Sequence, residues 1–408
     1  MRLLARADCN GLQRGAEVSS LKAMAMPNLL SRLWHRPSSR ARLWQALALG
    51  LFGAAIWWLW TNLTGNLARR DLGIDFRFLS GRASFEFGEN LAGYQAGDSF
   101  LRAFLAGLGN TIQVAVAGIV LTTILALALA LVRLSPNRLA RRLTGTWIEL
   151  IRNTPLLLQL LFWHQFIIRQ LPMPRQAWEP LPGVFLSNRG LVFPAPETAA
   201  ALLPMICAVL VGISVALVLR RTPSVHGSRL YHFLPICLLV APPLIALLIA
   251  PPSISFPELK GFNFHGGSSV SPEFIALLCA LVIYQSAFMA ETIRSGILAV
   301  PKGQIEAAQA LGLPRFQLLW LVVLPQALRI AIPPVTSQYL SLTKNSSLAV
   351  AIGYPDLVRV SQVTISETGR AVECVSILLA VYLSLSLFTA LIMDVYNRRV
   401  MRRGGAAA

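Results

Sequence analysis

The chain has 408 residues, of which 55% are hydrophobic and 13% are charged, and its mean hydropathy is +0.60. Soluble domains carry about 25% charged residues, so this composition excludes an ordinary soluble protein and indicates a protein that crosses a membrane several times. The formal net charge of +18 would suit a nucleic-acid partner, but the placement of the charges argues against one.

Apolar segments long enough to cross a bilayer recur along the chain. A transmembrane helix needs roughly 20 mainly apolar residues, and eight segments approach this length. They cover residues 43–60, 110–132, 148–168, 199–219, 233–250, 274–290, 321–342 and 375–393. Prolines at 204, 242–243 and 333–334 interrupt three of them and blur their boundaries. We therefore expect an all-α polytopic membrane protein with about eight transmembrane helices.

Basic residues gather in three of the loops that flank these spans. Arg133, Arg138, Arg141 and Arg142 follow the second span, Arg220, Arg221 and Arg229 the fourth, and Arg398, Arg399, Arg402 and Arg403 the eighth. The connection after the first span mixes acids and bases, as in Asp75, Arg77 and Glu86. Cytoplasmic loops of membrane proteins carry an excess of Lys and Arg, so the pattern predicts that both termini and residues 300–319 are cytoplasmic. Retention of basic loops in the cytoplasm accounts for the net positive charge, so a nucleic-acid partner is not needed to explain it.

One polar segment near the C-terminus interrupts the apolar runs: residues 300–325 read VPKGQIEAAQALGLPRFQLLWLVVLP. Pro301 suits the first turn of a helix, where a backbone N–H is not needed. Gly312 can end that helix in a left-handed conformation, and Pro314 disfavours helical backbone in the residue before it. A second helix can then start at Arg315. The sequence predicts a short helix, a tight break and another helix.

The spacing of Glu306-Ala307-Ala308, Gly312 and Leu324-Pro325 resembles the EAA loop of permease subunits in ATP-binding-cassette (ABC) importers. Val322 stands where that family usually has Ile. An E-A-A triplet alone also suits an ordinary amphipathic loop at the membrane surface, but the register of the later residues favours docking. The resemblance implies that Ala307 and Ala308 form a narrow docking surface and that Glu306 is its charged contact. The residues expected to couple the chain to an ATPase are Gly303, Glu306, Ala307, Ala308 and Gly312.

Polar residues near the spans form a second candidate site, because polar groups in hydrocarbon are costly and usually face a bundle interior or a water-filled path. Residues 104–118 and 151–166 resemble the openings of the first two core helices in polar-amino-acid permeases, and 344–348 (KNSSL) resembles their K-D-T-S-L segment, with Asn in place of the acid. The resemblance implies a substrate pathway at Asn110, Thr111, Thr154, Gln159, Lys344, Asn345, Ser346 and Ser347. Helix capping and interhelical hydrogen bonding explain the first three equally well.

Two segments outside the core make the resemblance more specific. Residues 74–108 and residues 185–191, FLSNRGL, resemble the external segment and the insertion of the permease in the general L-amino-acid importer. The insertion is also similar to that of its glutamate/glutamine/aspartate/asparagine relative. The resemblance implies a permease subunit that moves L-amino acids, either polar, acidic and amide ones or a broad range, across the bacterial inner membrane into the cytoplasm.

The resemblance further implies an architecture and a set of partners. A five-helix importer-permease core of the MetI-like kind would comprise spans two, three, six, seven and eight, with three peripheral helices. The expected parts are a basic cytoplasmic tail (1–42), a first anchor with an external loop (43–109), a first core part (110–168), an insertion with two spans (169–272), a second core part (273–394) with the coupling loop 300–320, and a cytoplasmic tail (395–408). The expected partners are an ABC ATPase dimer, a second permease of different sequence, a periplasmic amino-acid-binding protein, an L-amino-acid substrate and membrane lipid.

Motifs for catalysis and nucleotide binding are absent from the sequence. There is no G-x-x-x-x-G-K-[ST] loop to cradle phosphates and no G-x-S-x-G nucleophile motif. The five cysteines and five histidines show no disulfide or metal spacing. We therefore expect a non-catalytic subunit that binds no cofactor itself, with ATP and Mg²⁺ held by the partner ATPase.

The main alternative is a secondary amino-acid transporter driven by an ion gradient. Such a protein would need inverted repeats and an intramembrane acid that couples to ions. No repeat is evident in the sequence, and Glu149, Glu291 and Asp394 fall at predicted cytoplasmic ends of spans. A membrane-embedded enzyme is a more distant alternative, because the sequence offers no catalytic constellation.

Single cysteines introduced into a cysteine-free background test the predicted topology. An impermeant maleimide should label Arg141→Cys and Ser228→Cys in inside-out vesicles and Gly88→Cys in right-side-out spheroplasts, because arginine-rich loops are retained in the cytoplasm. Each cysteine should be protected in the opposite preparation. Labelling with the two groups exchanged would overturn the eight-span arrangement.

Overall fold

The computed structural model describes residues 37–69, 73–88, 93–196 and 253–405, together with residues 207 and 241. The chain divides into two compact units, Met1–Ile74 and Asp75–Ala408. Five helical segments among the described residues are long and apolar enough to cross a membrane: Arg40–Asn66, Phe100–Leu134, Pro272–Leu298, Arg315–Ile352 and Ala371–Arg399. The expected spans 199–219 and 233–250 lie outside the described residues, apart from positions 207 and 241.

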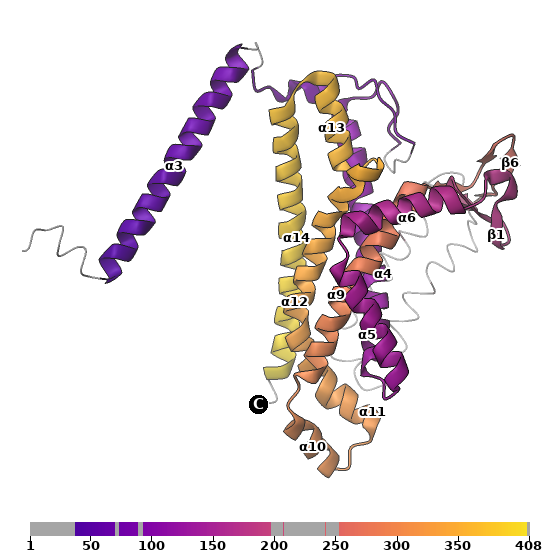
Figure 1. The fold of residues 1–408 in the computed structure, drawn as a ribbon. Helices are drawn as coiled ribbons and strands as arrows, with labels where there is room; N and C mark the ends of the chain where they lie inside the picture. Colours follow the sequence, from indigo (N-terminus) through magenta and orange to yellow (C-terminus); the bar gives the residue numbers. More distant parts are fainter. Residues whose placement is uncertain are drawn as a thin grey trace, which may run out of the picture. The chain divides into compact units, whose positions relative to one another are not determined.

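The first unit contains one described helix, α3 (Pro37–Arg69) (Figure 1). It includes the whole of the expected span 43–60 and continues for several residues at either end. Between these limits the sequence is apolar on nearly every side, which is typical of a helix surrounded by lipid. The prediction of a helix at this position is confirmed.

The centre of the second unit is the pair α4 (Phe100–Leu134) and α9 (Pro272–Leu298). Helix α12 (Leu324–Asn345) packs against α9, and α14 (Ala371–Gly405) packs against α12 (Figure 1). Small side chains let α4 and α9 approach closely. Ala126 and Ala130 of α4 are buried in one cluster with Ala287 and Ala290 of α9. In lipid, where the solvent is itself apolar, such close packing is a main source of helix association.

Helix α4 begins ten residues before the expected span 110–132, at Phe100. Its N-cap is Ser99, whose Oγ accepts a hydrogen bond from the backbone N–H of Arg102 at 3.4 Å. A serine cap satisfies one of the free N–H groups at the start of a helix. The boundary expected at residues 109 and 110 therefore falls inside a continuous helix.

The single helix expected over 148–168 is wrong. The chain instead forms α5 (Arg138–Asn153) and α6 (Leu156–Gln170), which are separated by Thr154 and Pro155. Thr154 has an extended backbone with φ −99° and ψ 127°. A residue before proline is pushed out of the helical region by the proline ring, so α5 has to end there.

The described chain is mostly helical, as expected, but it is not all-α, because the two described ends of the insertion 169–272 form short strands. A four-stranded antiparallel sheet has the order β1-β2-β3-β8, and two further strand pairs are β4-β5 and β6-β7. The strands are β1 (Trp178–Leu181), β2 (Val184–Ser187), β3 (Gly190–Phe193), β4 (Ala195–Pro196), β5 (Ile254–Ser255), β6 (Glu258–Lys260), β7 (Asn263–His265) and β8 (Ser268–Val270). The sheet pairs β3 with β8 and so joins residues that are far apart in sequence.

Glycine turns are the local reason for this sheet. Gly190 opens β3 with φ +106°, and a Cβ there would collide with the carbonyl oxygen of Val270 in β8. Gly183 has φ +77° in the turn between β1 and β2. Glycine adopts such angles without steric cost, and turns of this type join antiparallel strands.

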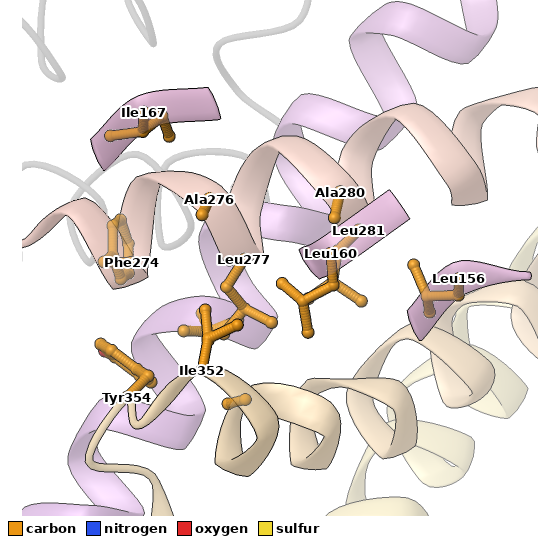
Figure 2. Close-up of a cluster of buried hydrophobic side chains, with 12 residues drawn as sticks. Leu156, Leu160, Ile167, Phe274, Ala276, Leu277, Ala280, Leu281, Ile352 and Tyr354 are labelled. Atoms are coloured by element: carbon orange, nitrogen blue, oxygen red, sulfur yellow. The ribbon is translucent and has the colours of Figure 1, made fainter. Parts of the chain in front are cut away.

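The chain after α12 packs back onto the start of α9. The segment η6 (Ser346–Ile352) is followed by Gly353, which has φ +81°, and then by Tyr354 and α13 (Leu357–Thr368). Tyr354 is fully buried, and its ring centroid lies 5.8 Å from that of Phe274 at the start of α9. Figure 2 shows Ile352 and Tyr354 beside side chains of α9 in the cluster that also contains Leu160 of α6.

The turn at residues 355–357 is locked to α4. The Asn110 Nδ2 donates to the carbonyl oxygen of Pro355 at 2.9 Å, and the Thr111 Oγ1 accepts from the backbone N–H of Leu357 at 3.1 Å. A Cβ on Gly107 would lie 2.8 Å from the Val360 Cγ2 and 3.1 Å from the Leu357 Cα, so the backbones touch. Both polar side chains are fully buried, where an unmade hydrogen bond would cost about 1–3 kcal/mol.

Asp356 caps α13 within this lock. Its Oδ1 accepts from the backbone N–H of Arg359 at 2.8 Å, whereas its Oδ2 has no hydrogen-bond partner among the described residues. Burial raises the pKa of Asp356 to about 7, although hydrogen bonds from the backbone of α13 work in the opposite direction. The carboxyl group is therefore protonated in the folded protein over a pH range in which the unfolded chain ionises it.

Asp356→Asn should remove a pH dependence of stability while keeping the cap, because Asn is as good an N-cap as Asp. Because the pKa of Asp356 is higher in the folded protein than in the unfolded chain, its contribution to stability is fully present below pH 3.8. This contribution is lost as the pH rises through about 7. The free energy of unfolding of the wild type, relative to the variant, should fall by roughly 3 kcal/mol between pH 5 and pH 8. Unfolding curves of both proteins, recorded in the same detergent at pH 5 and pH 8, measure this difference in free energy. The same difference at both pH values would contradict a raised pKa of Asp356.

Candidate functional site

The segment 300–320, called the docking segment below, has the local structure that the sequence predicts. Helix α10 (Lys302–Ala310) is followed by Gly312 with φ +75°, and α11 (Arg315–Gln317) begins where the second helix was expected (Figure 1). The backbone N–H of Gly312 donates to the carbonyl oxygen of Gln309 at 2.9 Å. The predicted helix, break and restart are confirmed.

Ala308 does not belong to the outer surface of the docking segment. It is 4% exposed and lies in a cluster with Val300, Leu318, Val323 and Ala327, so it fixes α10 to the start of the following helix. The expected docking surface therefore lies on the side of α10 that faces away from Ala308. Gly303, Glu306 and Ala307 are exposed there, as is Gly312 at the break.

Two exposed apolar residues extend this surface and were missed by sequence reasoning. Leu311 is 81% exposed and Phe316 is 69% exposed. They flank Gly312 on either side of the break. Large apolar side chains in a segment predicted to be cytoplasmic were the available signal, because neighbouring exposed apolar groups mark interaction surfaces.

A short π-helix joins the docking segment to α12. The segment η5 (Leu318–Val323) ends where the backbone N–H of Leu324 donates to the carbonyl oxygen of Leu319, five residues earlier. Pro325 follows and cannot donate a backbone hydrogen bond at all. A π-turn is one way to take up such a defect without ending the helix, so the path from α11 into α12 is continuous, and α12 also runs through Pro333 and Pro334.

An ion cluster ties the neighbouring helix ends together. The Glu291 carboxylate of α9 contacts the Arg133 Nε of α4 at 3.0 Å and the Arg294 guanidinium at 2.8 Å. Arg133 also donates to the carbonyl oxygen of Arg141 in α5. A Cβ on Gly145 would collide with the Arg133 guanidinium. Ion pairs, a hydrogen bond and close packing therefore hold the ends of α4, α5 and α9 together.

The polar residues expected along a substrate pathway are not brought together into one site. Asn110 and Thr111 hold the 355–357 turn, as described above. The Gln159 Nε2 donates to the carbonyl oxygens of Ile151 and Thr154 at 3.0 and 3.1 Å, and so bridges the break between α5 and α6. The Thr154 Oγ1 donates to the carbonyl oxygen of Leu150. For Asn110, Thr111 and Thr154, these contacts are of the kind that the alternative explanation expects.

The segment 344–347 contributes two residues to the lining of a groove. Lys344 and Ser347 line a cavity of about 450 Å³ together with side chains of α13 and α14, among them Val358, Leu379 and Tyr382. Asn345 is half-buried, and Ser346 is buried with its Oγ donating to the Thr343 carbonyl oxygen. The Lys344 side chain is exposed within a helical segment that is long and apolar enough to span a membrane. An ammonium group in contact with lipid is costly, so this groove faces water or another protein.

Across residues 37–405, as far as they are described, no group of three or more His, Cys, Asp or Glu side chains could hold a metal ion.

Similar proteins are membrane subunits of transporters. The model of the family "binding-protein-dependent transport system inner membrane component" matches residues 208–402. The chain is 43% identical to the putative amino-acid ABC transporter permease protein YhdX of Escherichia coli K12, over 89% of this chain and 95% of the relative. It is 40% identical to the general L-amino acid transport system permease protein AapQ of Rhizobium johnstonii, over 89% and 93% of the two chains.

A third relative is the glutamate/glutamine/aspartate/asparagine transport system permease protein BztB of Rhodobacter capsulatus, at 35% identity over 91% of this chain and 96% of the relative. These relatives are matched over nearly their whole lengths, and each is named as a permease protein of an amino-acid transporter or transport system. The chain therefore belongs to the family of binding-protein-dependent transport system inner membrane components, as a permease subunit of an ABC transporter.

Proposed function

We propose that this chain is the permease subunit of an importer that carries L-amino acids into the cytoplasm across the bacterial inner membrane. The relatives named for general L-amino acids and for glutamate, glutamine, aspartate and asparagine support polar, acidic and amide substrates or a broad range. The observation that carries the proposal is the docking segment, an exposed helix and break at the end of a helical bundle. The alternative of an ion-driven transporter has no comparable feature in its favour.

The proposed topology has eight spans and both termini in the cytoplasm. Helices α4, α9, α12 and α14, together with the α5–α6 pair, form the five-part importer-permease core. Helix α3 and the expected spans 199–219 and 233–250, which lie outside the described residues apart from positions 207 and 241, would be the three peripheral additions. The proposed parts follow the order expected from the sequence, with the boundary between the external loop and the first core part moved to Ser99 and Phe100, where α4 begins. Arginine-rich loops support this orientation.

The proposed mechanism uses the docking segment as a lever. A dimer of ATPase subunits, which hold ATP and Mg²⁺, would contact Gly303, Glu306, Ala307 and Gly312, with Leu311 and Phe316 adding apolar contact. Ala308 packs α10 against η5 and the start of α12, so a displacement of α10 would also move α12. Rigid-body rotation of the core would then exchange an inward-facing for an outward-facing path.

Three further partners complete the proposed transporter. A second permease of different sequence would cover the groove at Lys344 and Ser347, which would place these residues on the path between the two subunits. A periplasmic amino-acid-binding protein would deliver the L-amino acid. Membrane lipid would surround the remaining apolar surface.

Changes on the outer side of the docking segment should uncouple transport. Ala307→Asp adds bulk and charge to a close contact, and Gly312→Pro forces φ from +75° to about −65° and removes the N–H that bonds Gln309. Both should lower ATP-dependent uptake at least about 100-fold, on the scale of a lost close contact in an interface, while the protein still inserts. Gln309→Asp, the same charge on another side of α10, is the matched control and should keep uptake near that of the wild type. Normal uptake and stimulated ATP hydrolysis in both variants would refute the coupling role.

Reconstitution distinguishes the importer from the ion-driven alternative. Proteoliposomes containing this chain, the second permease and the ATPase should take up labelled L-glutamine only with internal ATP and the binding protein, because this chain has no phosphate-binding loop. An ATPase variant without its phosphate-binding lysine should abolish uptake, and a protonophore should not. Uptake by this chain alone under a proton or sodium gradient would establish the alternative.

A further inference from the structure

A second cavity lies where the strands of the insertion meet the helical core. It has a volume of about 440 Å³, within the range of about 300–1,000 Å³ that is usual for small-molecule sites. Four segments line it: residues 85–88 before α4, the turn between β2 and β3, the junction of β8 with α9, and the stretch from Gly353 into α13. It lies at the end of the second unit that carries α13, away from the docking segment (Figure 1).

Two arginine residues line this cavity from different elements. Arg189 lies in the turn between β2 and β3, within the FLSNRGL segment, and its NH1 donates to the Asn263 Oδ1 at 2.6 Å. Arg359 lies in the first turn of α13 and is exposed. The N-terminal end of a helix carries partial positive charge, which adds to the attraction that Arg359 exerts on an anion.

Two acidic residues line the same cavity. Glu273 lies in the first turn of α9, its side chain is 31% exposed, and its Oε1 is 4.0 Å from the His164 Nε2. Glu86 is exposed in the segment before α4. The Ser269 residue adds a hydroxyl group, and Phe85 and Phe87 add apolar walls. The cavity thus offers both signs of charge within one small volume.

The lining is held in place by contacts outside the cavity. The Ser84 hydroxyl donates to the Glu367 Oε1 at 2.6 Å, which fixes the segment 85–88 to the end of α13. The lock between α4 and the 355–357 turn fixes the opposite wall. The β3–β8 pairing attaches the Arg189 turn to α9, because α9 follows β8 directly. A preformed site loses little affinity to ordering on binding.

We propose that this cavity binds the zwitterionic part of a free L-amino acid, with the α-carboxylate on Arg359 and Arg189 and the α-ammonium on Glu86 and Glu273. Guanidinium groups pair with carboxylates through charge-assisted hydrogen bonds, and carboxylates accept from an ammonium group. A site of this kind recognises the α-carboxylate and the α-ammonium group that all free α-amino acids share, and it makes no specific contact with the side chain. The inference rests on the proposed function and adds to it a recognition site built partly by the insertion.

Direct binding to the purified complex of permeases and ATPase, without binding protein, tests the site. Labelled L-glutamine is the probe, and wild type, Arg359→Gln, Glu86→Gln and Arg175→Gln are compared. Arg175 is the matched control, since it is an exposed arginine that stacks on Phe262 and does not line the cavity. Arg359→Gln and Glu86→Gln should each weaken binding at least tenfold, and the control should not. N-acetyl-L-glutamine and L-glutamine amide, which each lack one charge, should compete at least tenfold less well than L-glutamine.

The outcomes separate this inference from the proposed function. Equal binding by wild type and both cavity variants, or equal competition by the two analogues, would overturn the zwitterion site while ATP-dependent uptake by the wild type still held. Weaker capture of the binding protein with unchanged L-glutamine binding would reassign the cavity to protein docking. A wild-type complex that takes up no amino acid would instead defeat the proposed function. Unchanged thermal unfolding and assembly of the variants exclude misfolding as the cause of lost binding.

Discussion

The second unit depends on the contact between α4 and the turn at residues 355–357. Gly107 lets the two backbones touch, and Asn110 and Thr111 each form a hydrogen bond with the turn. These hydrogen bonds lie in a fully buried place, so each one specifies a position as well as stabilising it. The contact sets where α13 starts and thereby places Asp356 and Arg359.

Different kinds of contact hold the two ends of this unit. At the end with α13, hydrogen bonds from α4, the capped start of α13 and the β3–β8 pairing arrange a preformed cavity. At the end with α10, the Arg133–Glu291–Arg294 cluster joins the helix ends and Ala308 packs α10 onto the next helix. Close helix packing between them, with alanines on both α4 and α9, makes the bundle stiff. A stiff bundle can transmit a movement from one end to the other as a rigid body.

Sequence reasoning succeeded where local chemistry decides the conformation. Gly312 takes a positive φ and α11 restarts at Arg315, because glycine and proline restrict the backbone through their own covalent structure. It failed at Pro155, where the same rule applied but the apolar run on both sides was taken as one span. It also missed the strands of the insertion, since these are at most four residues long and β3 pairs with β8, which lies far along the chain.

The sequence by itself determined the class of protein, the apolar helices and the docking segment, because hydropathy, charge placement and turn residues act over short stretches of chain. Only the tertiary structure decided what each polar side chain does. Asn110 and Gln159 proved to be bonded to backbone carbonyl groups, and Arg189 and Arg359, 170 positions apart in the numbering, proved to line one cavity. The hydrogen-bond partner of a buried side chain, and the nearness of two residues far apart in sequence, follow from how distant segments pack. The local sequence around each residue carries no information about that packing.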